Sequence, residues 1–460
     1  MTGRRTGPGS AEGGGGGAST RGEPPLRDRI ATYVRSLALE EIPPAVRERA
    51  KAHLAYHIAL GLRGSSSEEA DRAAAMARDW CQGAPASSVI GGDMRLGPPE
   101  AAFVNAARIR ATGLDDVLLP SGVHAGVVVV PAALALAEAL ARPGRELLAS
   151  IVIGYDVIGK LGDTVWAWAA DAPRRPTIAF GPFGPAAAAA RLLGLDARRT
   201  AEAIGYAANL AMGLAEGGLP DQYYGLVARN GMLAAHLAAR GGTTAPTALE
   251  GDLGFFRTFF GGIPAGLEAS VGSLGHRFEI ENATAKRYPG TALNIVPIEL
   301  MLDAVRRYGL SAERVRSVTV FLPAQRSNFR EGHAPGPFPS RSRAASSVIF
   351  QLAIALLDGR IEHRRYADVG DPDVLDTAGK IRVELEPGHG VTYARLELEM
   401  EDGGRHTLEG EGIVLPPTDW PGMLRREGRR LPEVERLIEM IRRLEALPDA
   451  ALLGEALRIA

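Results

Sequence analysis

The sequence has a single cysteine, few aromatic residues and almost no net charge, and each scarcity narrows what the chain can be. Cys81 alone can form neither an intramolecular disulfide nor a site with several thiolate ligands, which fits a reducing compartment. The formal net charge is -2, and the 52 Lys and Arg are scattered through the 460-residue chain, so the sequence indicates no basic face for nucleic acid. We therefore expect a cytoplasmic protein that does not bind nucleic acid.

Long uninterrupted apolar runs are also missing. The most apolar stretch, Val127–Ala141, contains Glu138 and is too short to span a bilayer, so it predicts a buried helix. Residues 1–25 are rich in Gly, Ser and Pro and have too few apolar side chains to offset the entropy lost on ordering. The arginines near their start are followed by glycines instead of an apolar segment. We expect a disordered tail, no signal peptide and no membrane partner.

The apolar pattern divides the rest of the chain into parts with different periodicity. Residues 26–285 have helical spacing in Ala-rich segments, and alanine both favours helix and lets helices approach closely. Residues 286–415 mix helical segments with period-two alternation, which predicts an α+β domain. Residues 416–460 are helical again and are expected to return to the helical body. The predicted fold class is mainly α with an α+β second domain: an all-helical domain built from both chain ends, plus an inserted α+β lid.

Individual elements follow from the same pattern. The clearest predicted helices are Val127–Leu140, Gly184–Leu193, Arg199–Leu214, Gly225–Ala239, Ile298–Tyr308, Ser346–Leu357 and Pro432–Leu447. Proline is tolerated at the first position of the last of these. The predicted strands are Val315–Leu322, Lys380–Leu385, Thr392–Met400 and His406–Ile413.

Two familiar motifs are present only in part. Residues 154–160, GYDVIGK, have the spacing of a phosphate-binding loop, but Leu161 replaces the hydroxyl that would bind magnesium, so a helix with an apolar face is favoured. His53 and His57 have the i, i+4 spacing of a metal pair, yet Leu54 stands where a metalloprotease has Glu, and no third ligand is evident. We predict packed or partly exposed histidines and no metal.

Several segments after the tail are distinctive: AAFVNAARIRATGLDDVLLPSGVHAGVVVVPAALALAEAL from Ala101, GYDVIGKLGD from Gly154, FGPFGPAAAAARLLGLD ending at Asp196, LAAHLAARGG from Leu233, KRYPGTALN from Lys286 and FQLAIALLDGRI from Phe350. In their order and spacing they resemble the MmgE/PrpD family over nearly the whole chain after the tail. The resemblance implies a helical domain built from both chain ends with an α+β lid, assembled as a homodimer. It also implies proton chemistry without a cofactor on a small molecule that bears carboxylates.

The resemblance implies catalytic roles for four residues. His124 matches the family histidine before an apolar run, and its titration range suits a general acid or base; alternatively it is a hydrogen-bonded histidine at a helix start. Lys286 opens the K-x-Y-P motif and would pair with a carboxylate, or else it is a solvated surface residue. Tyr223 and Tyr224 lie near the place of a missing family lysine and would supply a phenolic donor, or pack at an interface.

Other family positions suggest substrate binding. Arg110 and Arg175 stand where the family has histidine, and an arginine cannot act as a base near neutral pH but can clamp a carboxylate. Asp115 and Asp116 are retained, although Gly113 replaces the first aspartate of the same motif. We assign both arginines and both aspartates to substrate binding.

Two apolar replacements complete the set. Phe350, also assigned to substrate binding, lies where decarboxylases of the family carry tyrosine, and Val117 lies where they carry a hydroxyl. The leading hypothesis is a lyase or isomerase that dehydrates, decarboxylates or epimerises a small carboxylate-bearing substrate. The apolar replacements favour an alternative, a biosynthetic enzyme of specialised metabolism that cyclises, eliminates from or rearranges a larger and less charged molecule. A third hypothesis is a non-catalytic binding protein on the same fold.

Overall fold

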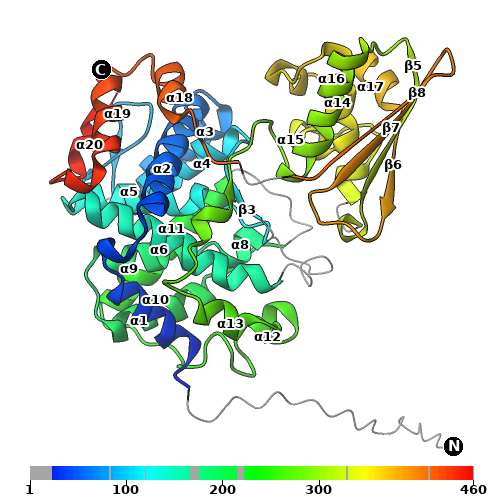
Figure 1. Ribbon diagram of the computed structural model, residues 1–460. Helices are drawn as coiled ribbons and strands as arrows, with labels where there is room; N and C mark the ends of the chain where they lie inside the picture. Colours follow the sequence, from blue (N-terminus) through cyan, green and yellow to red (C-terminus); the bar gives the residue numbers. More distant parts are fainter. Residues whose placement is uncertain are drawn as a thin grey trace, which may run out of the picture.

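Two hydrophobic cores define two domains in the computed structural model (Figure 1). The larger core takes its residues from 26–285 and 424–457, and the smaller takes its residues from 298–408. We call residues 286–415, which contain the smaller core, the lid domain. The structure describes residues 23–81, 84–119, 121–165, 176–214, 222–327, 330–412 and 415–458; residues 1–22 of the predicted tail lie outside this set. The predicted fold class is confirmed.

In the described residues, the larger domain is helical apart from turns, connecting segments and four two-residue strands. Its helices are α1 (Leu26–Ser36), α2 (Pro44–Gly64), α3 (Glu68–Trp80), α4 (Pro98–Ala111), α5 (Gly126–Ala139), α6 (Gly144–Gly162), α8 (Pro176–Phe180), α9 (Phe183–Leu192), α10 (Ala197–Asn209), α11 (Gln222–Ala239), α12 (Phe255–Phe260), α13 (Leu267–Gly272), α18 (Trp420–Glu427), α19 (Val434–Arg442) and α20 (Ala451–Ala456). The last three contribute to the same core as the helices that precede the lid domain, so the C-terminal segment returns to the helical body (Figure 1).

Helix α5 lies at the centre of this domain. Every residue from Gly126 to Glu138 is buried, as expected for a helix that is apolar on all sides. Helices α6 and α9 pack closely against it, because a Cβ at Gly154 or at Gly184 would lie within 3 Å of Val129 side-chain atoms. Residues 154–160 are part of the continuous helix α6, so this segment is not a phosphate-binding loop.

The lid domain is one four-stranded sheet with helices on one face (Figure 1). The strands are β5 (Val315–Pro323), β6 (Ile381–Glu386), β7 (Ala394–Met400) and β8 (Arg405–Gly410), and the helices are α14 (Ile295–Tyr308), α15 (Arg341–Ser346), α16 (Val348–Asp358) and α17 (Pro372–Ala378). The strand order is β6-β5-β7-β8, with β5 and β6 parallel and the other pairs antiparallel. Buried residues alternate along β7, which is the period-two pattern that predicted the sheet.

Two predicted helices end earlier than expected. The helix predicted to reach Leu214 ends at Asn209, and Gly213 adopts a φ of 100°, outside the helical range. The predicted helix Pro432–Leu447 begins only at Val434 and ends at Arg442, followed by a 3-10 turn. The buried Lys51 ammonium donates to the Arg442 carbonyl at this end, 3.0 Å away. Pro432 therefore lies in the preceding turn and not at the first helical position.

The two domains are joined through a small area. Strand β3 (Val117–Leu118) of the α4–α5 connection pairs with β4 (Ala283–Thr284) immediately before the lid. The amide of Ala285 donates to the Leu415 carbonyl at 2.7 Å, so the two connecting segments between the domains are hydrogen-bonded to each other. The Gly290 amide donates to the Gly113 carbonyl at 3.1 Å. The entrance and exit of the lid therefore lie together, next to the segment that carries the candidate site.

No helix in the described part of the chain is both long enough and apolar enough to cross a membrane.

Gly290 should be the residue at the domain junction that tolerates a side chain least. Its φ is 99°, and a Cβ there would lie 1.9 Å from the Ala345 carbonyl oxygen, whereas Gly261 has a φ of 79° and no heavy atom within 4 Å of the added Cβ. Gly261→Ala should cost about 1 kcal/mol from backbone strain alone. Gly290→Ala should cost roughly 2 kcal/mol more because the clash adds to the strain. Urea denaturation of both variants checks this, and equal losses would contradict the close approach.

Candidate active site

The candidate site is built where α4 ends and α5 begins. After α4 the chain turns at Gly113, which has a φ of 67°, and Asp115 follows before β3. His124 lies two residues before the start of α5. Because β3 pairs with β4, Lys286, two residues beyond β4, is placed beside Asp115 although the two are far apart in sequence. The short pairing therefore assembles residues from both domains.

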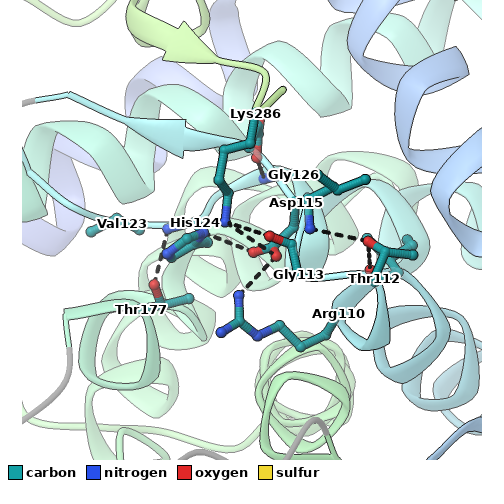
Figure 2. Close-up of polar contacts among 12 residues, drawn as sticks. Arg110, Thr112, Gly113, Asp115, Val123, His124, Gly126, Thr177 and Lys286 are labelled. Atoms are coloured by element: carbon teal, nitrogen blue, oxygen red, sulfur yellow. Dashed lines mark hydrogen bonds and ion pairs between the residues drawn. The ribbon is translucent and has the colours of Figure 1, made fainter. Parts of the chain in front are cut away.

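Asp115 is the centre of a cluster of charged side chains, the Asp115 group, which also contains Arg110, His124 and Lys286 (Figure 2). The Arg110 guanidinium donates to Oδ1 of Asp115 at 2.8 Å, and Lys286 Nζ lies 3.6 Å from the same oxygen. His124 Nδ1 lies 2.7 Å from the other oxygen, Oδ2. The structure thus brings together four of the residues selected from the sequence.

The Lys286 ammonium has three acceptors around it. It donates to the carbonyls of Gly113 at 3.3 Å and Gly290 at 3.0 Å, in addition to its ion pair with Asp115 (Figure 2). The lysine side chain is fully buried, which rules out the alternative of a solvated surface residue. Gly113, where the family has an aspartate, contributes a backbone acceptor in place of a side chain.

The group is only partly open to solvent. The side chains of Asp115 and Lys286 are completely buried, whereas His124 is 18% and Arg110 17% exposed. A small molecule approaching from solvent would therefore meet the imidazole and the guanidinium first. Asp115 and Lys286 lie behind them.

Burial and charge shift the pKa values of this group in opposite directions. Burial alone would raise the pKa of Asp115, but the positive charges of Arg110, Lys286 and His124 hold it well below its usual range. Burial lowers the pKa of Lys286 to about 8. The negative charge of Asp115 acts to raise this pKa, and the positive charge of Arg110 offsets part of that effect. Burial also lowers the pKa of His124, so this imidazole is neutral near pH 7.

Asp116 points away from the Asp115 group, so it does not join Asp115 in the predicted set. Its carboxylate faces His53 and His57 of α2, at 3.0 and 3.3 Å, and accepts hydrogen bonds from the Tyr155 hydroxyl at 2.6 Å and the Gly126 amide at 3.0 Å. Burial acts to raise the pKa of Asp116, but the two histidines hold it below its usual range. We call His53, His57, Asp116 and Tyr155 the Asp116 group.

The remaining predicted residues have different positions. Tyr224 is buried beside the site, with the Arg110 guanidinium 4.5 Å from its ring centre and the His124 ring edge-on to it. Tyr223 is half-buried and packs against the helical core. Phe350 packs between Phe338 and Tyr366 in the lid core, so the structure does not bring it to the Asp115 group. Arg175 lies outside the described residues.

Some residues that hold the site were not recognised from the sequence. The Thr177 hydroxyl accepts a hydrogen bond from the backbone amide of His124 at 2.9 Å, and so fixes the start of α5. The Tyr56 hydroxyl donates to the Leu114 carbonyl and accepts from the Lys286 amide at 3.2 Å. Hydroxyls that bind backbone groups carry no spacing signal. The pair His53 and His57 did carry one, but Asp116, the acid that faces them, is distant in sequence.

Comparison with known proteins identifies the class to which this fold and site belong. The model of the MmgE/PrpD N-terminal domain matches residues 28–268, and the chain belongs to the MmgE/PrpD family. The family resemblance of the sequence is thereby confirmed.

Two cis-aconitate decarboxylases match nearly the whole chain, and a third relative matches half of it. A cis-aconitate decarboxylase of Aspergillus terreus is 28% identical over 469 residues, which cover 90% of this chain and 93% of the relative. The cis-aconitate decarboxylase of Homo sapiens is 26% identical over 467 residues and 94% of each chain. The cis-aconitate decarboxylase-like protein oryM of Aspergillus oryzae is 33% identical over 249 residues, half of each chain. The likeness to the decarboxylases therefore includes the lid domain.

Asp115 should contribute substantially to stability because it compensates buried positive charge. Asp115→Asn leaves the Lys286 ammonium buried without its anion and should cost about 3 kcal/mol of unfolding free energy at pH 7, measured by urea denaturation. Asp163→Asn is the matched control, because Asp163 pairs with Arg277, which is 54% exposed. That exposed pair should be worth less than about 1 kcal/mol. Similar losses in the two variants would contradict the assignment.

The contribution of Asp115 should also depend on pH. Because its folded-state pKa lies below the unfolded value of about 4, the stabilisation is present above that pH and is lost as the pH falls toward the folded-state pKa. The difference in unfolding free energy between the native protein and Asp115→Asn should therefore narrow as the pH is lowered below about 4. A difference that widens with acid would have the wrong sign.

Proposed function

We propose that this chain is a lyase that transfers protons without a cofactor on a small substrate bearing carboxylates, with His124 as the proton-transfer residue. The observation that carries the proposal is the contact of the partly exposed His124 with the buried Asp115, flanked by Lys286 and Arg110. The coverage of nearly the whole chain by cis-aconitate decarboxylases supports cis-aconitate as the first substrate to test.

The charge of the site supports an anionic substrate. Lys286 and Arg110 bring two cations to the site, and both contact Asp115. The planar guanidinium of Arg110 is suited to bind a substrate carboxylate through two donors, and the positive charge of Lys286 would attract the same group.

His124 has a defined direction for its chemistry. A carboxylate oxygen accepts hydrogen bonds, so the ring nitrogen that faces Asp115, Nδ1, carries the proton in the neutral imidazole. The lone pair is then on Nε2, on the opposite side of the ring. In dehydration or epimerisation this nitrogen would accept a proton from a carbon beside a carboxylate. Asp115 holds the ring orientation and stabilises the imidazolium that results.

Decarboxylation would use the same nitrogen as a donor. When the bond to the departing carboxylate of cis-aconitate breaks, its electron pair forms a new double bond, and the pair of the old double bond moves to the carbon beside another carboxylate. Carbon dioxide leaves, and that carbon takes up one proton. An anionic substrate raises the pKa of a nearby histidine, so His124 would acquire this proton from water when the substrate binds and then deliver it.

Lys286 has an electrostatic role in this scheme. Its three donors already face the Gly113 and Gly290 carbonyls and Asp115, so none is directed to a substrate carbon. Its fixed positive charge, together with Arg110, would stabilise the negative charge that develops on the substrate.

Removal of His124 should abolish most of the activity while the protein stays folded. His124→Ala should lower kcat for cis-aconitate decarboxylation by about 100-fold to 10,000-fold, which is the contribution expected of a proton-transfer residue. His276→Ala, at an exposed turn, is the control and should leave kcat unchanged. The measurements are carbon dioxide release from cis-aconitate and, because dehydration of methylcitrate releases only water, chromatographic detection of the dehydrated product of methylcitrate. Unchanged turnover in His124→Ala, or no turnover of either substrate by the native protein, would refute the proposal.

The rate should fall in mild alkali because Lys286 loses its charge. The Lys286 ammonium has a pKa of about 8, so kcat/KM, which reports the free enzyme, should decline as the pH rises through that value. In Lys286→Arg the charge persists, because arginine stays protonated to a pKa above about 12, and the decline should move to higher pH even if the maximal rate is lower. An unshifted alkaline limb in this variant would assign the decline to another group.

A further inference from the structure

The Asp116 group lies behind the Asp115 group and has no part in the scheme above. His53 and His57 are one turn apart on α2, and both side chains, like that of Asp116, are completely shielded from solvent. One ligand atom from each of the three residues can be chosen so that all lie within 4.8 Å of one another. The third partner that the sequence did not reveal for the histidine pair is therefore Asp116.

The hydrogen bonding of His57 fixes which of its nitrogens has a lone pair. Nδ1 lies 2.7 Å from the backbone carbonyl of His53, and since a carbonyl can only accept, Nδ1 carries the hydrogen. In the neutral ring Nε2 is then an acceptor, and it faces Oδ1 of Asp116, also an acceptor, at 3.3 Å. Two acceptors at this distance repel each other unless a positive centre lies between them.

The ring nitrogens of His53 also lack hydrogen-bond partners among the described residues. Nδ1 of His53 lies 3.0 Å from Oδ2 of Asp116, but neither ring nitrogen makes a hydrogen bond of suitable direction within the described residues, and the same holds for Nε2 of His57. Buried polar atoms of native proteins normally have partners, so three such nitrogens on two neighbouring histidines require an explanation. A bound cation would satisfy the two nitrogens that face Asp116.

The outer contacts match those of a metal-binding site. Histidine ligands of metals commonly donate their second ring N–H to a backbone carbonyl, as His57 does to His53, and ligating carboxylates are themselves hydrogen-bonded. Asp116 accepts from the Tyr155 hydroxyl and the Gly126 amide, one on each oxygen. The close approach of Gly126 is part of this arrangement, since a Cβ there would lie 2.0 Å from the His57 ring.

From this geometry we propose that His53, His57 and Asp116 bind one divalent transition-metal ion, with zinc as the ion best suited to two imidazoles and a carboxylate. Zinc takes such ligands at about 2.0–2.2 Å and accepts a fourth, non-protein ligand. The ion would join α2 to the segment that carries Asp115 and to the start of α5. Its role is structural, and the proposal holds whether or not the proposed reaction is correct.

The metal content of the native protein provides the first test, because it requires no variant to fold. Protein purified from zinc-supplemented cells should contain about one zinc ion per chain by elemental analysis. After removal of metal with a chelator, added zinc should raise the Tm, and added cobalt should give the visible absorption of a tetrahedral Co²⁺ centre. Protein that contains no metal and binds neither ion would overturn the proposal.

Variants then identify the ligands. His53→Gln and Asp116→Asn should lose the zinc and the cobalt spectrum, whereas His236→Gln, on α11, should retain both. Tyr155→Phe keeps the ring but removes the hydroxyl that orients Asp116, and it should weaken zinc affinity by about 10-fold to 100-fold. Unchanged affinity in Tyr155→Phe together with retained metal in His53→Gln would place the ion elsewhere and refute the assignment.

Discussion

The burial of the Asp115 carboxylate is the constraint on which the rest of the site depends. A carboxylate shielded from water is unfavourable unless positive charge and polar groups surround it. Here the positive charge comes from the end of α4 and the first residue of the lid domain, and a neutral imidazole comes from the start of α5. None of these segments could move far without exposing an uncompensated charge. The same contacts therefore also hold the first residue of the lid domain against the helical domain.

The sequence predicted the fold better than the site, for physical reasons. Helical and period-two spacing reports which face of an element is buried, and this was sufficient for α5, for the lid strands and for the return of the C-terminal helices. Spacing says nothing about contacts between distant segments. Lys286 appeared to be a possible surface residue because the two-residue pairing that buries it is too short to leave a pattern. For the same reason Asp116 could not be connected with His53 and His57.

The replaced family positions have a common effect. Arg110, in place of a histidine, contributes a permanent charge to Asp115, and Gly113, in place of an aspartate, presents a carbonyl to Lys286. One titratable base and one negative charge are therefore absent, while the cations remain. His124 is left as the imidazole of the group, and burial lowers its pKa. Phe350, by contrast, belongs to the packing of the lid and not to this balance.

The hydrogen bond between Ala285 and Leu415 has a mechanical consequence. It joins the chain segment that enters the lid domain to the segment that leaves it, so both connections lie at one point. Lys286 is the first residue of the lid after that point. In a rotation about a fixed axis, displacement grows with distance from the axis. A rotation of the lid about this point would therefore displace the Lys286 ammonium beside Asp115 least, and the alignment of the charges in the Asp115 group would change little.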